Sequence, residues 1–383
     1  MTTNNADIEI NYTNNSPLGG LFVLAAMIAS ATIIASPGVT SIHDSAGDAL
    51  MLLGSALGFA VTLPKLRRSM LPHLLFGFAF LCYYFVNSFG TSSSLAGIRH
   101  TLSAFAGISA LLFFSCYGSM IRSQRAWSQV LIFFSVASIA LVATSGMPKN
   151  IASGTIAYLV SIIASLTIKD RNDWRKPLAF GATIALLGYL NEFRALIPLS
   201  LGFVTIWILY DKFPRFFSFT SATIALFFFS YAIIWFYTSI YTSYLAADIS
   251  HTIASISGRP ATSGREWLWP IIISAASNSP LYGVGSGIVP ANIVSTDYSS
   301  HNYYLQTFLQ AGLIGTIFLT LLLISVLNHL SNKDLICGRF GVSLFIMFII
   351  HNSSEVIMLQ NGMTAGLMAW TAIGICISTD KVS

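Results

Sequence analysis

Four arginines occupy positions that a membrane-type sequence rarely gives to a charge. Arg99 and Arg194 lie at or just inside apolar runs, and Arg259 and Arg265 lie in a long connection between two such runs. Arginine holds its charge at any physiological pH and binds phosphate oxygens through a planar fork of donors. A charge within the bilayer is costly unless it faces a partner or a wet cavity. The set predicts a pocket for an anion, although each arginine alone also fits a side chain reaching to water.

His301, which is followed by Asn302 and Tyr303, opens the apolar run after that long connection. Histidine titrates near neutral pH and suits a general base at a membrane–water boundary, although an interfacial capping residue fits this position too. Glu355, between the last two runs, could pair with an arginine of the pocket or accept a proton. The histidines lack the HExxH and short metal-ligand spacings, so the sequence predicts no metal site and no cofactor.

The long connection itself is too aromatic and patterned for a simple linker. A capping box that begins at Ser263 predicts a helix with Arg265 in its first turn, where free backbone N–H groups favour an anion. Trp267 and Trp269 suit a helix at the membrane surface with the indoles at headgroup level. Pro270 lies too deep for a helix capped at Ser263, so the helix is kinked or begins later.

A GxGxG sequence at Gly283, Gly285 and Gly287 follows this helix. A dinucleotide-binding loop would need another glycine spacing and a βαβ unit around it, and neither is present. The glycines instead predict a tight turn that folds the chain back onto the membrane.

The composition determines which kind of element must hold these residues. The chain has 383 residues, of which 55% are hydrophobic and 9% charged, with a mean hydropathy of +0.72. Soluble domains are near 25% charged, so a soluble enzyme is excluded, as are disorder, a coiled coil and a secreted disulfide scaffold. Twelve apolar runs approach the length of a spanning helix; they cover residues 18–36, 46–63, 71–89, 98–120, 128–144, 151–168, 178–191, 195–210, 217–241, 302–328, 339–354 and 356–378.

These runs predict an all-α polytopic membrane protein of about 12 transmembrane helices, with residues 1–383 forming one integral-membrane domain. Residues 242–300 form the one long loop, between the ninth and tenth spans, and carry site residues. The seventh and eighth runs, 178–191 and 195–210, are short, so whether both cross the membrane stays open.

Charge placement predicts the orientation of the chain in the membrane. Of the 19 lysines and arginines, 14 fall in every second connection or at the C-terminus. The positive-inside rule makes that side cytoplasmic, so both termini lie in the cytoplasm and the long loop with its arginines lies in the periplasm. The formal charge of +5 then reflects membrane topology, and nucleic acid is not an expected partner.

Several of these motifs together resemble the O-antigen ligase and polymerase superfamily, bacterial inner-membrane glycosyltransferases that act on undecaprenyl-diphosphate-linked glycans. The matching features are Ser-Gly-Arg-x-x-x-Trp from Ser263, Pro-x-x-Gly-x-Gly-x-Gly from Pro280, and His-Asn-Tyr-Tyr-Leu from His301 before a span that contains Gly312 and Gly315. The resemblance is strongest over residues 263–315. In looser form it extends to Arg194-Ala195, to the topology and to Glu355.

The resemblance implies a glycosyltransferase-C-like fold and an inverting, metal-independent transfer. By motif match the essential arginines and histidine of the family correspond to Arg194, Arg265 and His301. A small hydroxyl residue often precedes the first of these arginines, and Phe193 stands there in this chain.

We expect His301 and Arg265 to be catalytic, with His301 as the base for the acceptor hydroxyl. Arginines stabilise the developing phosphate charge of a diphosphate leaving group, which removes the need for a metal. The residues expected to bind the diphosphate or the glycan are Arg194, Arg259, Arg99, Trp267, Asn302, Tyr303 and Glu355.

Three functions fit these expectations. A polymerase would join lipid-linked O-antigen or exopolysaccharide repeats, and a ligase would move the finished glycan onto the lipid A-core; the expected partners are these glycans, the acceptor and membrane lipids. The rather short outer loop favours the polymerase slightly. A lipid-linked glycan flippase is the alternative from another class, but the chain shows no repeated halves and its polar clusters gather at one face. The sugar, the linkage, the acceptor and the oligomeric state stay open.

Overall fold

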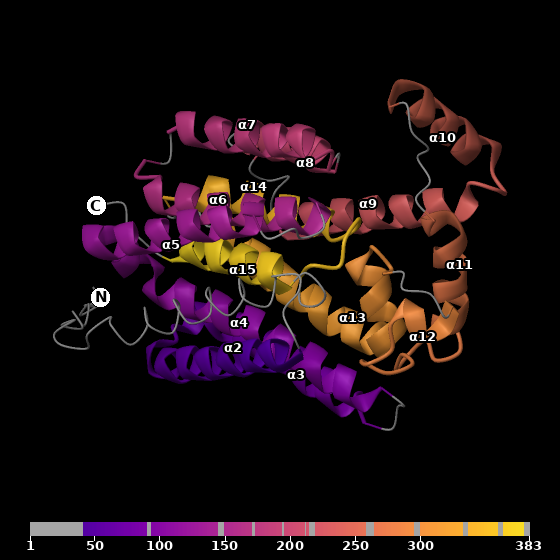
Figure 1. Cartoon of the computed structure of the whole chain (residues 1–383), viewed down its shortest axis with the longest axis horizontal. Coiled ribbons are helices and arrows are strands. Elements are labelled where there is room, and N and C mark those ends of the chain that lie inside the picture. Colours follow the sequence, from indigo (N-terminus) through magenta and orange to yellow (C-terminus); the bar gives the residue numbers. More distant parts are fainter. Residues whose placement is uncertain are drawn as a thin grey trace, which may run out of the picture.

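The computed structural model describes residues 41–89, 93–144, 149–170, 173–193, 195–210, 212–213, 219–257, 264–294, 299–331, 336–358 and 363–378. In these residues every regular element is helical (Figure 1). The helices are α2 (Ser41–Thr62), α3 (Leu71–Val86), α4 (Ser94–Ser123), α5 (Arg125–Thr144), α6 (Lys149–Thr167), α7 (Arg175–Leu190), α8 (Leu196–Leu209), α9 (Phe219–Ser239), α10 (Tyr244–Ser257), α11 (Arg265–Ala276), α12 (Pro290–Val294), α13 (Tyr303–Leu330), α14 (Gly338–His351) and α15 (Met363–Ile377). Two 3-10 turns, η1 (Leu63–Lys65) and η2 (Arg68–Met70), join α2 to α3.

The predicted apolar runs coincide with helices, one helix to a run, apart from the run 18–36, which lies outside the described residues. By length and composition, five helical stretches can cross a membrane; they are Arg68–Val86, Ser94–Ser123, Arg125–Thr144, Lys149–Thr167 and Tyr303–Leu330. The all-α polytopic membrane class is therefore confirmed, while the number of twelve spans stays a prediction.

Two of the helices in predicted spans, α7 and α8, are shorter than a membrane crossing requires. Helix α7 has 16 residues and α8 has 14. At 1.5 Å per residue both measure less than about 25 Å, whereas the hydrocarbon core is about 30 Å thick. The two helices pack against each other as a hairpin, which lies at one edge of the bundle in Figure 1.

The centre of the bundle is the contact between α4 and α15 (Figure 1). Small residues let the two backbones approach closely there. A Cβ added at Gly374 would lie 2.7 Å from the Cβ of Phe114, and one at Gly118 would lie 2.7 Å from the hydroxyl of Ser378. Small residues are favoured between transmembrane helices because they permit this backbone approach.

Contacts at the two ends of the bundle agree with the alternation of the charges. At one end, Arg122 donates to the sulfur of Cys337, with 2.8 Å between Nη1 and Sγ; both residues belong to connections predicted to be cytoplasmic. At the other end, Asn191 donates to the hydroxyl of Ser153 over 2.9 Å, and both belong to the predicted outer side. Each end thus collects connections that the sequence assigns to one face.

Helix α13 is interrupted at Gly312, where φ is 58° and ψ is −159°. Gly283 has a φ of 78°, which lets the chain reverse direction at this residue. The resulting turn lies against the break in α13. Val284 and Gly285 donate to the carbonyls of Leu309 and Gln310, over 2.8 and 3.1 Å between N and O. The glycine motif therefore forms a tight turn against α13, which confirms the prediction of a tight turn.

Helix α11 begins at Arg265 with Gly264 as its N-cap, at a φ of 86°. The helix therefore begins later than the predicted capping box, and Ser263 lies outside the described residues. Trp269 is fully buried and lies 4.9 Å from Tyr237 of α9, measured between ring centroids. The expectation of Trp269 at headgroup level was wrong, because α9 and α13 cover that face of α11.

Candidate active site

His301 and Glu355 come from connections far apart in the sequence and meet at the start of α13. The Nδ1 of His301 lies 3.0 Å from Oε2 of Glu355. The histidine side chain is 32% exposed, whereas the glutamate side chain is 14% exposed. The carboxylate is thus the more deeply buried of the two groups.

The backbone around His301 is fixed from both sides. His301 has a φ of +47°, an uncommon conformation for a residue with a side chain. On one side of it, the indole of Trp269 donates to the carbonyl of Ser300 over 2.7 Å. On the other side, Asn302 caps α13 by accepting a hydrogen bond from Leu305 N over 2.9 Å. These bonds hold the ring against the segment that carries Glu355.

That segment, residues 352–355, is bound directly to the start of α13. The amide of Asn302 donates to the carbonyl of Ser353 over 3.1 Å, and Tyr303 N donates to the carbonyl of Asn352 over 2.8 Å. Asn302 and Tyr303 are themselves fully buried. In this structure both residues position the backbone of the site rather than present a polar group to solvent.

Arg265 approaches the same segment from the first turn of α11. Its Nη2 donates to the carbonyl of Ser354 over 2.9 Å, and its guanidinium lies over the ring of Tyr237, 5.8 Å from the centroid. Its Nε is buried without a hydrogen-bond partner in the described residues. The carbonyl that Arg265 binds belongs to the residue just before Glu355. A half-buried guanidinium with an unused donor at this place suits an anionic ligand.

The surroundings of Glu355 favour its charged form. Burial alone raises the pKa of this carboxyl, but the hydrogen bond from His301 and the electrostatic interactions with His301, His351 and Arg265 outweigh burial. The pKa of Glu355 is therefore lowered from 4.5. The amide of Asn150 lies 3.5 Å from its other oxygen. Glu355 is consequently an anion at neutral pH, and it can hold the Nδ1–H tautomer of His301.

A second histidine connects this site to the turn that carries Arg194. His351 is buried, and its Nδ1 lies 2.9 Å from the hydroxyl of Tyr158. Its ring packs against Phe193, with 5.8 Å between centroids. Arg194 itself lies outside the described residues. The contact of its neighbour Phe193 with His351, four residues before Glu355, brings this turn close to the site.

The remaining expected residues lie elsewhere or outside the described residues. Arg99 is exposed on α4 beside His100, whose Nδ1 donates to the carbonyl of Ser286 over 2.8 Å. This contact brings the first turns of α4 next to the glycine loop. Trp267 lies on α11, 38% exposed, and Arg259 lies outside the described residues.

Several contributors to the site escaped the sequence analysis. Asn150, Tyr158 and Tyr237 lie in apolar or helix-end positions where nothing marks a polar role. The carbonyl of Ser354 carries no sequence signal at all. His351 lies at the end of α14, and its partner Tyr158 is 193 positions away in the sequence.

The arrangement is that of a general-base dyad beside a cation. With Nδ1–H donated to Glu355, the Nε2 of His301 carries the lone pair that can take a proton from a hydroxyl group. Arg265 can stabilise negative charge that develops nearby. Within the described part of the chain, three or more His, Cys, Asp or Glu side chains nowhere lie close enough together to hold a metal ion.

The fold and the site together define a helical membrane protein whose polar residues suit group transfer at one end of the bundle. Residues 193–320, about a third of the chain, match the family model described as O-antigen ligase. The resemblance to the O-antigen ligase and polymerase superfamily is therefore confirmed, and this domain supports glycosyl transfer of the ligase or polymerase type. A comparison with curated proteins gave no match.

Proposed function

We propose that this protein transfers a glycan from undecaprenyl diphosphate to an acceptor hydroxyl at the periplasmic face of the bacterial inner membrane. The observation that carries the proposal is the His301–Glu355 pair with Arg265 beside it. Arg265 and the start of α13 lie inside the segment matched by the O-antigen ligase model, and Glu355 joins them from outside it.

In this proposal His301 Nε2 takes the proton of the acceptor hydroxyl while the hydroxyl oxygen attacks the anomeric carbon. The bond from that carbon to the diphosphate oxygen breaks, and its electron pair stays on the diphosphate. Arg265 binds this charge, assisted by Arg194 and by Arg259 or Arg99. Attack from the face opposite the leaving group inverts the anomeric centre, and arginine charge takes the place of a metal ion.

The acceptor separates two versions of the proposal. A polymerase adds the glycan to another lipid-linked repeat, and we favour this version because residues 242–300 form a rather short loop. A ligase adds the glycan to the lipid A-core, and the description of the matched family favours it. A flippase is less well supported, because His301, Glu355 and Arg265 gather at one end of the bundle instead of along a path through it.

A glycolipid gel of the host strain tests the proposal. A clean deletion is complemented with wild type, with His301→Ala and with His251→Ala. The control residue His251 is an exposed histidine on α10. We expect His251→Ala to restore the wild-type pattern and His301→Ala to reproduce the deletion.

The deletion pattern identifies the acceptor. A core that carries one repeat means a polymerase, whereas a bare core with long glycan still on the lipid carrier means a ligase. An unchanged pattern for every surface glycan, or full restoration by normally expressed His301→Ala, would overturn the proposal.

A further inference from the structure

An apolar groove runs along the outside of the bundle between α2 and α3. Its volume is about 810 Å³, and it is lined by Phe59, Leu63, Arg68, Leu71, Pro72, Leu74, Leu75, Phe76 and Phe78. The groove exists because α2 packs chiefly against α4 and α3 packs chiefly against α13, rather than against each other. Leu71, Leu75 and Phe78 are each at least half exposed along it.

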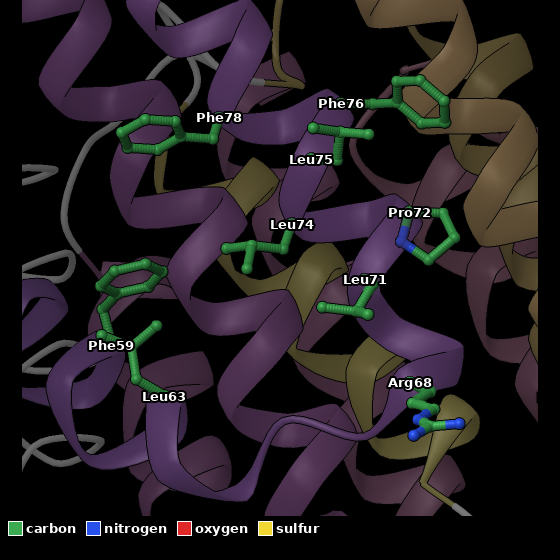
Figure 2. A pocket seen from close by; sticks show the side chains of 9 residues that line it. All are labelled: Phe59, Leu63, Arg68, Leu71, Pro72, Leu74, Leu75, Phe76 and Phe78. Atoms are coloured by element: carbon green, nitrogen blue, oxygen red, sulfur yellow. The ribbon is translucent and has the colours of Figure 1, made fainter.

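Arg68 is the charged residue among those that line the groove, and it lies at one end. Figure 2 shows its guanidinium at the lower edge, with Leu71, Leu74 and Leu75 leading away from it towards Phe78. Arg68 is exposed, and it has no ion-pair or hydrogen-bond partner in the described residues. A cation without a partner at the mouth of an apolar groove is complementary to an amphipathic anion.

The turn that carries Arg68 adds further positive charge. Lys65 and Arg67 lie within three positions of it, and the Nζ of Lys65 lies 4.7 Å from the ring centroid of Tyr117. No acidic residue falls between positions 49 and 169 of the sequence. Basic clusters immediately beside a membrane span are typical binding sites for anionic lipid headgroups.

The groove lies at the opposite end of the bundle from the candidate active site. His73, at the start of α3, lies 3.0 Å from His329 in the last turn of α13, measured between ring nitrogens. Asn87, just after α3, donates over 2.9 Å to the carbonyl of Tyr282 in the glycine loop. Because α13 begins beside His301 and carries His329 in its last turn, the Arg68 turn and the active site lie on opposite faces of the membrane-spanning part.

We propose that this groove binds an anionic diacyl phospholipid of the surrounding bilayer, with its phosphate on Arg68 and one acyl chain along Leu71, Leu75 and Phe78. From Arg68 to Phe78 the helix rises about 15 Å, which is half the hydrocarbon thickness and thus the depth of one leaflet. The headgroup lies at the membrane surface with the basic turn, and the chain lies in the apolar part. The lipid belongs to the leaflet facing away from the active site, so it is distinct from a lipid-linked glycan substrate.

Native mass spectrometry of the full chain in mild detergent tests this proposal. The purified protein is mixed with phosphatidylglycerol or with phosphatidylcholine of the same acyl chains, at equal concentrations. We expect wild type to retain phosphatidylglycerol preferentially. Arg68→Ala should reduce its retention about fivefold, the effect of one cation near an anionic lipid surface, and Arg68→Lys should retain most of it.

Two matched controls separate the groove from the rest of the surface. Arg125→Ala removes another exposed arginine, at the start of α5, and should leave retention unchanged. Leu75→Trp fills the groove and should reduce retention of both lipids, whereas Leu141→Trp, at a similarly exposed leucine of α5 (59% against 64% for Leu75), should not. Unfolding temperatures of the variants check that each one is folded.

A phosphatidylglycerol analogue with a photoreactive acyl chain locates the bound lipid. Cross-links on the peptide that contains Leu71 and Leu75 support the proposal. Cross-links that avoid this peptide would overturn it, and so would equal retention of the two lipids by wild type or unchanged retention by Arg68→Ala. None of these results depends on glycosyl transfer, so this proposal and the proposed function fail independently.

Discussion

At the scale of single residues, the account depends on the charge that Glu355 holds beside His301. The pKa of Glu355 is lowered in the folded protein from 4.5, so its ionised form stabilises the fold. This contribution is fully present above the unfolded value and is lost as the pH falls through the lower, folded value. We therefore expect Glu355→Gln to lower the melting temperature of the purified protein at neutral pH, with the difference from wild type shrinking below pH 4.5. A difference that stays constant with pH would contradict the ionised pair.

Arg265 provides a second test at this scale, because its contacts depend on the planar shape of the guanidinium as well as on its charge. Lysine keeps the charge but loses the planar fork that reaches the carbonyl of Ser354. We expect Arg265→Lys to fold normally and to slow glycan transfer at least ~10-fold, and Arg265→Ala to slow it ~100-fold or more. Initial rates with purified protein at saturating donor measure both effects. Wild-type rates for Arg265→Lys would mean that charge alone suffices.

At the scale of elements, the break in α13 and the glycine turn form one unit. A Cβ at Gly283 would lie 2.4 Å from the carbonyl of Gln310, and one at Gly312 would lie 2.5 Å from the backbone of Gly283 and Leu281. Both glycines also have positive φ, where a side chain costs about 1–2 kcal/mol before any clash.

We therefore expect Gly283→Ala and Gly312→Ala each to lower the apparent melting temperature clearly. The matched control is Gly202→Ala in α8, because an added Cβ there meets nothing within 4 Å. Alanine in the interior of a helix is favourable relative to glycine by about 0.5–1 kcal/mol, so this variant should melt at or above the wild-type temperature. Equal melting temperatures for all three variants would contradict the close backbone contact.

The elements themselves were largely predictable, because apolar runs of near-bilayer length admit few alternatives to a helix. The sequence placed Arg265 in the first turn of α11, as observed, but the left-handed conformation of its N-cap Gly264 was not foreseen from the capping-box pattern. The break of α13 at Gly312 was also not foreseen. Its freed backbone groups are satisfied by a turn from another segment, in which Leu313 N donates to the carbonyl of Pro280 over 2.9 Å. Such long-range compensation has no local signature.

The site was predictable in its residue types but not in its pairing. The sequence pointed to His301, Arg265 and Glu355 as separate candidates, and the structure brings all three together. It could not show that Glu355 pairs with the histidine rather than with an arginine, because the two residues are 54 positions apart and the whole of α13 and α14 lies between them. Asn302 had been assigned to the substrate, yet its polar atoms bind Leu305 and Ser353.

At the scale of the whole molecule, we predict that the two ends of the bundle face opposite sides of the membrane. In a cysteine-free background we introduce single cysteines at Ser123, the last residue of α4, and at Asn278, just after α11, both of which are exposed. The positive-inside rule predicts that an impermeant maleimide added to intact spheroplasts labels the cysteine at 278 and labels the one at 123 only after lysis. The reverse pattern would place the site in the cytoplasm and exclude a periplasmic transferase.

The central claim is that His301 is the base of a glycosyl transfer, and initial rates with purified protein test it most directly. Wild type, His301→Ala and His251→Ala are compared in one reconstituted reaction with a lipid-diphosphate-linked glycan as the donor. A positioned general base contributes ~10²–10⁴-fold, so His301→Ala should lose at least ~100-fold while His251→Ala keeps the wild-type rate. A folded His301→Ala variant that transfers glycan within a few-fold of wild type would contradict the account.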